Sequence, residues 1–169
     1  MLCRRSKRAD KWQSGQEVCL KRVIYWFVLV LWLALAVFLS RQTGKETAEV
    51  SGGLTAWLIP VLRGMGIAAD PETLHALLRK AAHVVIYLVL GFLVCRAFRL
   101  SFRGGWVMPA AAAVCLAAAV LDEVQKGAVP GRHCQWDEAA LNAACVLVGL
   151  LLGWLAGRLS ARQRKKTES

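Results

Sequence analysis

The chain has 169 residues, a length typical of one domain; 57% of them are hydrophobic and the net charge is +11. Ordinary soluble domains are roughly 45–50% apolar even with glycine counted, and here the apolar residues form long blocks. These properties exclude a disordered chain, a disulfide-stapled secreted module and a collagen-like repeat, and they favour a small multi-span membrane protein over a soluble globule.

The first apolar block, Val23 to Ser40, holds eighteen residues without a formal charge. It is long enough to span a bilayer, at about 1.5 Å rise per residue and roughly 30 Å of hydrocarbon thickness. Trp26 and Trp32 add the aromatic bulk typical of membrane interfaces. The alternative is a cleavable signal peptide, but the heavily charged residues 1–22 and the lack of a small-residue cleavage site after the block favour a membrane span.

The segment after this span divides into two parts. Small and polar residues predict a loop that begins RQTGKETAEVSGG. The following stretch, LTAWLIPVLRGMGI, is apolar but too short to span and is interrupted by Pro60. We predict that it lies in the membrane interface or enters it as a re-entrant segment.

The second span should begin outside the bilayer. Asp70 is a good N-cap residue and Pro71 suits the first helical turn, so the helix is expected to start there. Fifteen uncharged residues lie between Lys80 and Arg96, and snorkelling arginines extend the span to about twenty residues. Side chains that are three or four residues apart lie on the same face of a helix. One face of this helix therefore carries His75, Arg79, His83, Tyr87 and Leu90.

The third and fourth spans follow as two further apolar blocks. Gly104 to Leu121 is rich in alanine, as packed membrane helices often are. Ala139 to Gly157 is interrupted only by Asn142. Small residues recur at every fourth position of the last block and predict close packing against a neighbouring helix, the alternative being a merely flexible helix: Gly149, Gly153 and Gly157.

The basic residues predict how the chain is oriented. Four spans place both termini on one side, and fifteen of the 22 basic residues lie in residues 1–22, in the connection between spans two and three, or after the fourth span. By the positive-inside rule these regions are cytoplasmic, and residues 41–80 and 122–138 face outward. Contacts with anionic lipid account for the basic ends, and no motif supports nucleic-acid binding.

We therefore predict an all-α fold: a four-span transmembrane helix bundle at residues 23–157, with the interfacial or re-entrant segment between spans one and two. Residues 1–22 form a basic cytoplasmic N-terminus and residues 158–169 a basic cytoplasmic tail. Multi-pass insertion in the cell membrane follows from this organisation.

The six cysteines do not form a disulfide framework, because Cys134 alone falls in a predicted outer loop. The sequence contains no CxxC, HExxH, GxSxG or Walker motif.

Polar residues from distant segments are expected to share one depth at the outer surface, where span two starts, span three ends and span four starts. Polar groups in spans are costly, so they usually face the bundle and pair. Each residue also has a structural explanation: a helix end in water, an exposed loop arginine, a satisfied core histidine or, at Asp137, a helix cap. The predicted cluster comprises His83, Asp122, Glu123, Arg132, Glu138 and Asn142.

Three sequence blocks resemble the VanZ-like family. They are SRQTG from Ser40, RKAAHVVIYLVLGFL from Arg79, and DEVQKGAVPGR from Asp122 followed by Glu138 or Asp137 and then Asn142. The family is named for a protein that gives resistance to the glycopeptide teicoplanin, so the resemblance implies a membrane protein linked to the cell envelope or to antibiotic resistance. Three positions depart from the family pattern: Ile86 where glutamate is frequent, Lys126 where glutamine is common, with Gln125 one place earlier, and Cys145 where glycine is commoner.

Two functional hypotheses compete most closely. The first is an envelope protein whose outer site binds a lipid head group or a glycopeptide-type ligand, with arginines contacting phosphate bidentately and carboxylates orienting these cations. Nucleic acid is not an expected partner, and the oligomeric state stays open. The predicted ligand-binding residues are Arg79, Lys80, Tyr87, Gln125, Arg132, Glu138 and Asn142.

The second hypothesis is a membrane-embedded hydrolase or transferase that acts on a lipid-linked substrate. His83 would be its general base, and Asp122 or Glu123 its acid or orienting group. No cofactor is expected, although these side chains could hold a divalent metal such as Mg²⁺. A small transporter or assembly partner, in which the polar cluster serves only packing, is a third possibility.

Overall fold

The computed structural model describes residues 2–41, 52–53, 56–60, 64, 70–127 and 135–167, with side chains between residues 16 and 163 except at positions 41, 75 and 79. These residues form four long helices, each with a segment long and apolar enough to cross a membrane. The predicted all-α, four-span architecture is confirmed. The helices are α1 (Leu2–Arg41), α3 (Pro71–Ser101), α4 (Val107–Lys126) and α5 (Trp136–Thr167).

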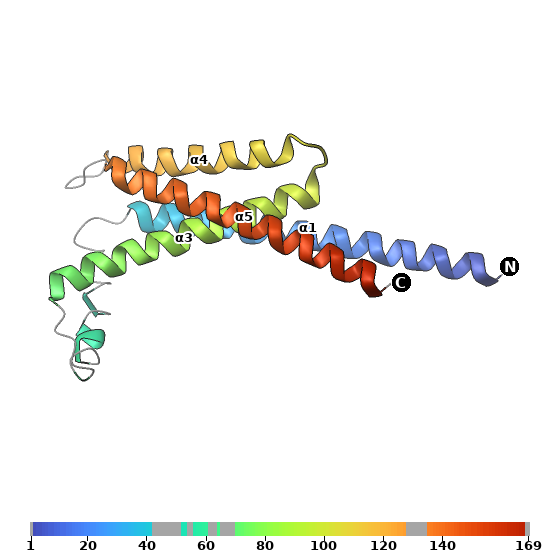
Figure 1. Cartoon of the computed structure of the whole chain (residues 1–169), viewed down its shortest axis with the longest axis horizontal. Helices are drawn as coiled ribbons and strands as arrows, with labels where there is room; N and C mark the ends of the chain where they lie inside the picture. Colours follow the sequence, from blue (N-terminus) through green and yellow to red (C-terminus); the bar gives the residue numbers. More distant parts are fainter. Residues whose placement is uncertain are drawn as a thin grey trace.

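The helices α3 and α5 form the central pair of the bundle, with α4 beside both and α1 packed mainly on α3 (Figure 1). Glycines allow this close crossing: a Cβ added at Gly91 would overlap the Val146 carbonyl oxygen, and one added at Gly149 would overlap the Leu88 carbonyl oxygen. At Gly153 an added Cβ would lie 2.9 Å from the Cys95 Cβ. The close packing predicted from the glycine stripe is therefore confirmed, and α3 is the neighbouring helix.

Two tryptophans attach α1 to α3. The indole N–H of Trp26 donates to the Ser101 hydroxyl at 2.8 Å, and that of Trp32 donates to the Ile86 carbonyl oxygen at 2.9 Å. Trp32 therefore makes an interhelical contact in addition to any role at the interface. Most other large apolar side chains of α1 are exposed, as expected of a peripheral helix that faces lipid.

The predicted helix boundaries hold at α3 and shift at α4. Asp70 caps α3 by accepting a hydrogen bond from the Thr73 backbone N–H at 3.0 Å, as its position predicts. Helix α4 begins at Val107, three residues after the predicted start, because Gly104 has a φ of 120° and belongs to the preceding turn. It also continues to Lys126, so the carboxylates expected to end the span lie inside its last turns.

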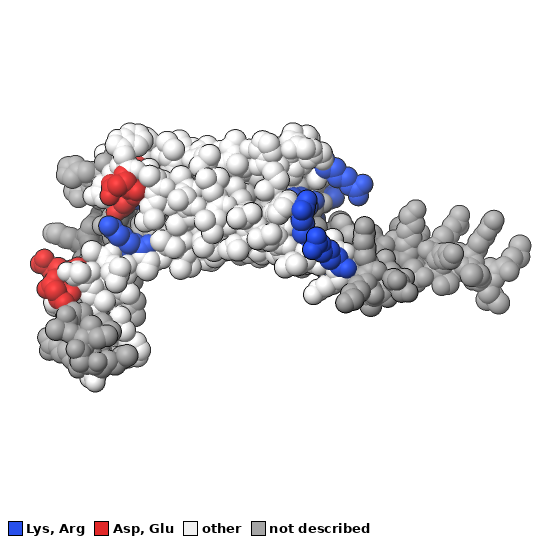
Figure 2. Space-filling view, in the orientation of Figure 1, with Lys and Arg blue, Asp and Glu red and all other residues white. Residues whose placement is uncertain are grey.

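Charged side chains lie at the two ends of the bundle. On the face shown in Figure 2, basic side chains gather at one end, acidic side chains lie at the other end together with a basic one, and the surface between the two ends is uncharged. This distribution is that of a protein whose middle crosses a hydrocarbon layer. The predicted interfacial segment and the connection with Arg132 and Cys134 lie largely or wholly outside the described residues, so these assignments stay predictions.

Candidate functional site

One face of α4 carries both small apolar residues and two charged residues into the bundle. Ala111, Cys115 and Ala119 recur at every fourth position and are fully or almost fully buried. The same face continues with Glu123, 0% exposed, and Lys126, 1% exposed. Because buried charges are costly unless paired, this end of α4 requires partners from neighbouring helices.

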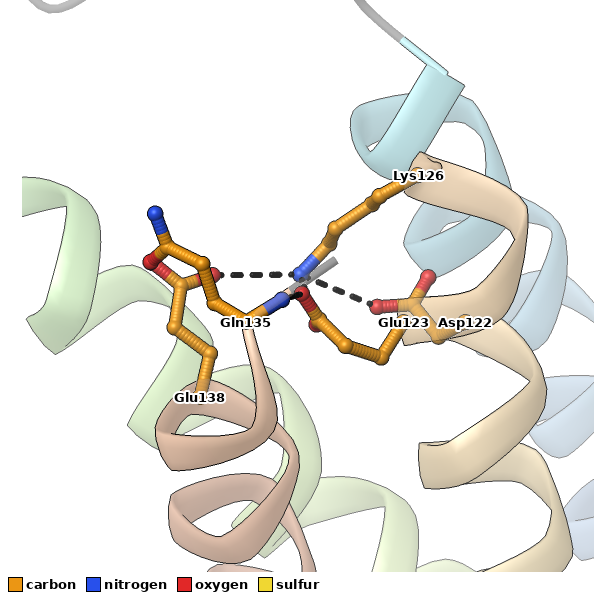
Figure 3. A network of polar contacts seen from close by, with 5 residues as sticks. All are labelled: Asp122, Glu123, Lys126, Gln135 and Glu138. Atoms are coloured by element: carbon orange, nitrogen blue, oxygen red, sulfur yellow. Dashed lines mark hydrogen bonds and ion pairs between the residues drawn. The ribbon is translucent and has the colours of Figure 1, made fainter. Parts of the chain in front are cut away.

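Lys126 lies at the centre of three carboxylates (Figure 3). Its ammonium nitrogen is 2.7 Å from Glu123 Oε2, 3.3 Å from Glu138 Oε2 and 3.4 Å from Asp122 Oδ2. Two of these carboxylates belong to α4 and Glu138 belongs to α5, so the ammonium links the two helices. The four described side chains carry three formal negative charges and one positive charge. We call them the outer carboxylate cluster, after the side of the membrane on which the predicted topology places them.

Glu123 also binds the start of α5 through its second carboxylate oxygen. Its Oε1 accepts a hydrogen bond from the Gln135 backbone N–H at 2.9 Å. Gln135 directly precedes α5, where helix N–H groups lack intrahelical acceptors. Both oxygens of the fully buried Glu123 therefore hold structural contacts.

Helix α3 supplies aromatic side chains to the same region. The Tyr87 hydroxyl lies close enough to the Asp122 carboxylate to interact with it. The Tyr87 ring is buried and stacks on His83, with ring centroids 6.3 Å apart and an interplanar angle of 11°. Tyr87 thus connects the half-buried His83 to the outer carboxylate cluster, and α3, α4 and α5 all contribute to the site.

Asn142 lies one helical turn from Glu138 on α5 and is 0% exposed. Within the described residues, neither its amide nitrogen nor its amide oxygen has a hydrogen-bond partner. A buried amide without partners costs roughly 1–3 kcal/mol, so an unsatisfied side chain at this depth is a distinctive feature of the site.

The structure brings some predicted site residues together and separates others. Asp122, Glu123 and Glu138 belong to the outer carboxylate cluster, and Tyr87 lies beside it with His83 stacked on its ring. Lys80 and Gln125 are exposed. Arg132 and the side chain of Arg79 lie outside the described residues. Asp137 is exposed in the first turn of α5, where a carboxylate suits the helix dipole.

Sequence reasoning missed the central residue, because Lys126 was considered only as a departure from the family pattern. Its position contains a usable signal: it follows Asp122 by four residues and Glu123 by three, and side chains with these spacings meet on a helix. Lysine at the last turn of a helix also interacts favourably with the helix dipole.

The central groups of the cluster are engaged in contacts within the protein. Both Glu123 oxygens are engaged, and the cation among the carboxylates is the Lys126 ammonium. In the part of the chain that the structure describes, no group of three or more His, Cys, Asp or Glu is placed to hold a metal ion. Asp122 and Glu138, with side chains 13% and 12% exposed, form the accessible edge of the cluster.

Comparison with known proteins agrees with this architecture. The family model described as VanZ/LLP1 matches residues 25–157, which include all or part of each of the four spans. Searches of curated proteins and of solved structures gave no significant match. The four apolar helices and the family match together show a multi-pass membrane protein that belongs to the VanZ/LLP1 family.

Proposed function

We propose that this protein binds the head group of an envelope lipid or a glycopeptide-type ligand at the outward-facing end of its bundle, and that this binding underlies a role in the cell envelope or in antibiotic resistance. The observation that carries the proposal is the outer carboxylate cluster, in which three carboxylates share the Lys126 ammonium and two of them reach the surface.

The charge of the cluster indicates which ligand groups it favours. Its described side chains leave two negative charges in formal excess, and carboxylates in a low-dielectric site gain most from charged or strongly polarised donors. Ammonium, amide N–H and hydroxyl groups supply such donors, and glycopeptides and sugar–peptide head groups carry them. The predicted phosphate contacts of Arg79 and Arg132 would bind a different part of the same head group.

Binding to defined probes tests the proposal. The full chain, reconstituted in lipid nanodiscs, would be titrated with teicoplanin and with a lipid-linked cell-wall disaccharide–peptide. We expect Glu138→Gln to weaken binding of at least one probe by about tenfold or more, because a hydrogen bond to a charged group is worth roughly 1.5–3 kcal/mol. Asp122→Asn should act in the same direction through the other accessible carboxylate.

The control is Asp137→Asn, which removes a neighbouring carboxylate that is exposed and outside the cluster. It should bind as the unmodified protein does. The proposal is wrong if neither probe binds, or if Asp137→Asn loses as much affinity as Glu138→Gln while both variants stay folded. Cleavage of the lipid-linked probe that disappears in His83→Ala would instead support the hydrolase or transferase.

The outward orientation of the cluster makes a separate prediction. If both termini are cytoplasmic, a membrane-impermeant maleimide added to intact cells should modify a variant that keeps only Cys134 and should not modify one that keeps only Cys19. Cys19 is an exposed free thiol, so it should react once the membrane is permeabilised. The opposite labelling pattern would place the outer carboxylate cluster in the cytoplasm.

A further inference from the structure

A cavity of about 380 Å³ lies at the opposite end of the bundle from the outer carboxylate cluster. It forms where α3 ends, α4 begins and the second half of α5 passes beside them. The turn between α3 and α4 is short, so the two flanking segments line the same space. Its principal lining residues are Arg99, Phe102, Arg103, Val107, Met108 and Trp154.

The charged side chains of this cavity are cationic. Arg99 and Arg103 are both exposed at its edge. A third guanidinium, that of Arg158, lies 4.1 Å from the centroid of the Trp154 ring, and Trp154 lines the cavity. No acidic residue occurs in residues 73–121 or 139–167, so α3, α4 and α5 place no carboxylate at this end. The positive potential is therefore uncompensated by these helices.

The remaining walls of the cavity are apolar and aromatic. Val107, Met108 and Trp154 line it, and the Phe102 ring stands between those of Phe98 and Trp106, with centroids 5.6 Å and 5.5 Å away. Aromatic rings beside cationic side chains are typical of the level where a membrane meets water. An inorganic anion would use only the arginines, whereas a molecule with a phosphate and a hydrocarbon chain would contact both kinds of wall.

We propose that this cavity binds an anionic phospholipid, with the lipid phosphate between Arg99 and Arg103 and the start of an acyl chain against Met108 and Trp154. Basic pockets between membrane helices recognise lipid head groups in this way, because guanidinium forms bidentate hydrogen bonds to phosphate. The site is independent of the outer carboxylate cluster. In the predicted topology it serves the cytoplasmic leaflet, where anionic lipid is concentrated.

Native mass spectrometry of the purified full chain tests the assignment. Phosphatidylglycerol and phosphatidylcholine with identical acyl chains would be titrated separately, and we expect phosphatidylglycerol to bind about tenfold or more tightly. Arg99→Gln/Arg103→Gln should reduce phosphatidylglycerol binding by about tenfold or more, to the level of phosphatidylcholine. Both arginines are exposed, so the variant should keep its helical content and thermal stability.

A matched control variant shows whether the lipid preference comes from the cavity arginines or from the positive charge of the protein in general. Arg22→Gln/Arg162→Gln removes two exposed arginines that do not line the cavity, and it should retain most of the preference for phosphatidylglycerol. Equal losses in the two double variants, or equal binding of the two lipids, would overturn the proposal. Displacement of phosphatidylglycerol by equimolar glycerol phosphate would also overturn it, because the cavity would then take a soluble phosphate ester.

Discussion

Lys126→Ala is expected to lower the free energy of unfolding by about 3–5 kcal/mol, because it removes one partner of a buried ion pair. Glu123, which is fully buried, would lose the ammonium that lies 2.7 Å from its carboxylate. Asp122 and Glu138 would lose the same cation, and α4 would lose its ionic link to α5 through Glu138. Denaturation of the purified protein in mixed micelles, followed by circular dichroism, measures the change.

The chain offers a matched control in a second lysine–glutamate pair. Lys21 lies 3.3 Å from Glu17 with i,i+4 spacing, but the two side chains are 50% and 63% exposed. Exposed pairs of this kind contribute roughly 0.2–1 kcal/mol, so Lys21→Ala should change stability only slightly. If Lys126→Ala were no more destabilising than Lys21→Ala, the outer carboxylate cluster could not be a buried ion network.

A double substitution distinguishes the loss of attraction from the cost of an unpaired charge. Glu123→Leu/Lys126→Met removes both members of the most buried pair and replaces them with apolar side chains. Because most of the damage in Lys126→Ala comes from the carboxylate left unpaired, the double variant should be less destabilised than the single one. A double variant at least as unstable as Lys126→Ala would contradict this explanation.

The spans were predictable from sequence because hydropathy depends on blocks of residues and not on the register of one side chain. The cluster depends on register. Neighbouring helical positions differ by about 100° around the axis, so Gln125 is exposed while Lys126 is buried. The i+3 and i+4 spacing could have indicated a contact between Lys126 and the α4 carboxylates, although Lys126 was considered only as a departure from the family pattern. The burial of the Glu123–Lys126 pair depends on another segment, because Glu138 contacts Lys126 and the Gln135 backbone N–H binds Glu123. No local pattern contains that information.

The interhelical contacts could also be predicted only where the sequence contains a repeated pattern, and not where a contact depends on a single residue. The stripe that includes Gly149 and Gly153 is periodic, so close packing could be predicted from it. Its counterpart on α3 is the single Gly91, which has no repeat around it. The hydrogen bond from Trp32 to the Ile86 carbonyl was equally hidden, because a carbonyl acceptor has no side-chain signature and a tryptophan in a span is typical of the membrane interface.

The α3–α5 crossing leads to a second large expected effect, that of Gly149→Ala. An added Cβ would overlap the Leu88 carbonyl oxygen and lie 3.0 Å from the Phe92 backbone nitrogen. Backbone cannot rotate away as a flexible side chain does, so the two central helices must separate. We expect a loss of about 3 kcal/mol, at the upper end of the usual range for overpacking. Thermal denaturation in detergent measures it.

Gly157→Ala is the matched control, because it lies two turns further along the same stripe. Its added Cβ would meet only the end of the Arg96 side chain, at 2.8 Å, and that flexible end is able to move. Alanine has a higher helix propensity than glycine by roughly 1 kcal/mol, so this variant should be neutral or slightly more stable. If both variants were equally stable, α3 and α5 would not be in backbone contact at Gly149.

Because Tyr87 of α3 reaches Asp122 only across packed helices, Gly149→Ala should also weaken probe binding at the outer carboxylate cluster, whereas Gly157→Ala should not.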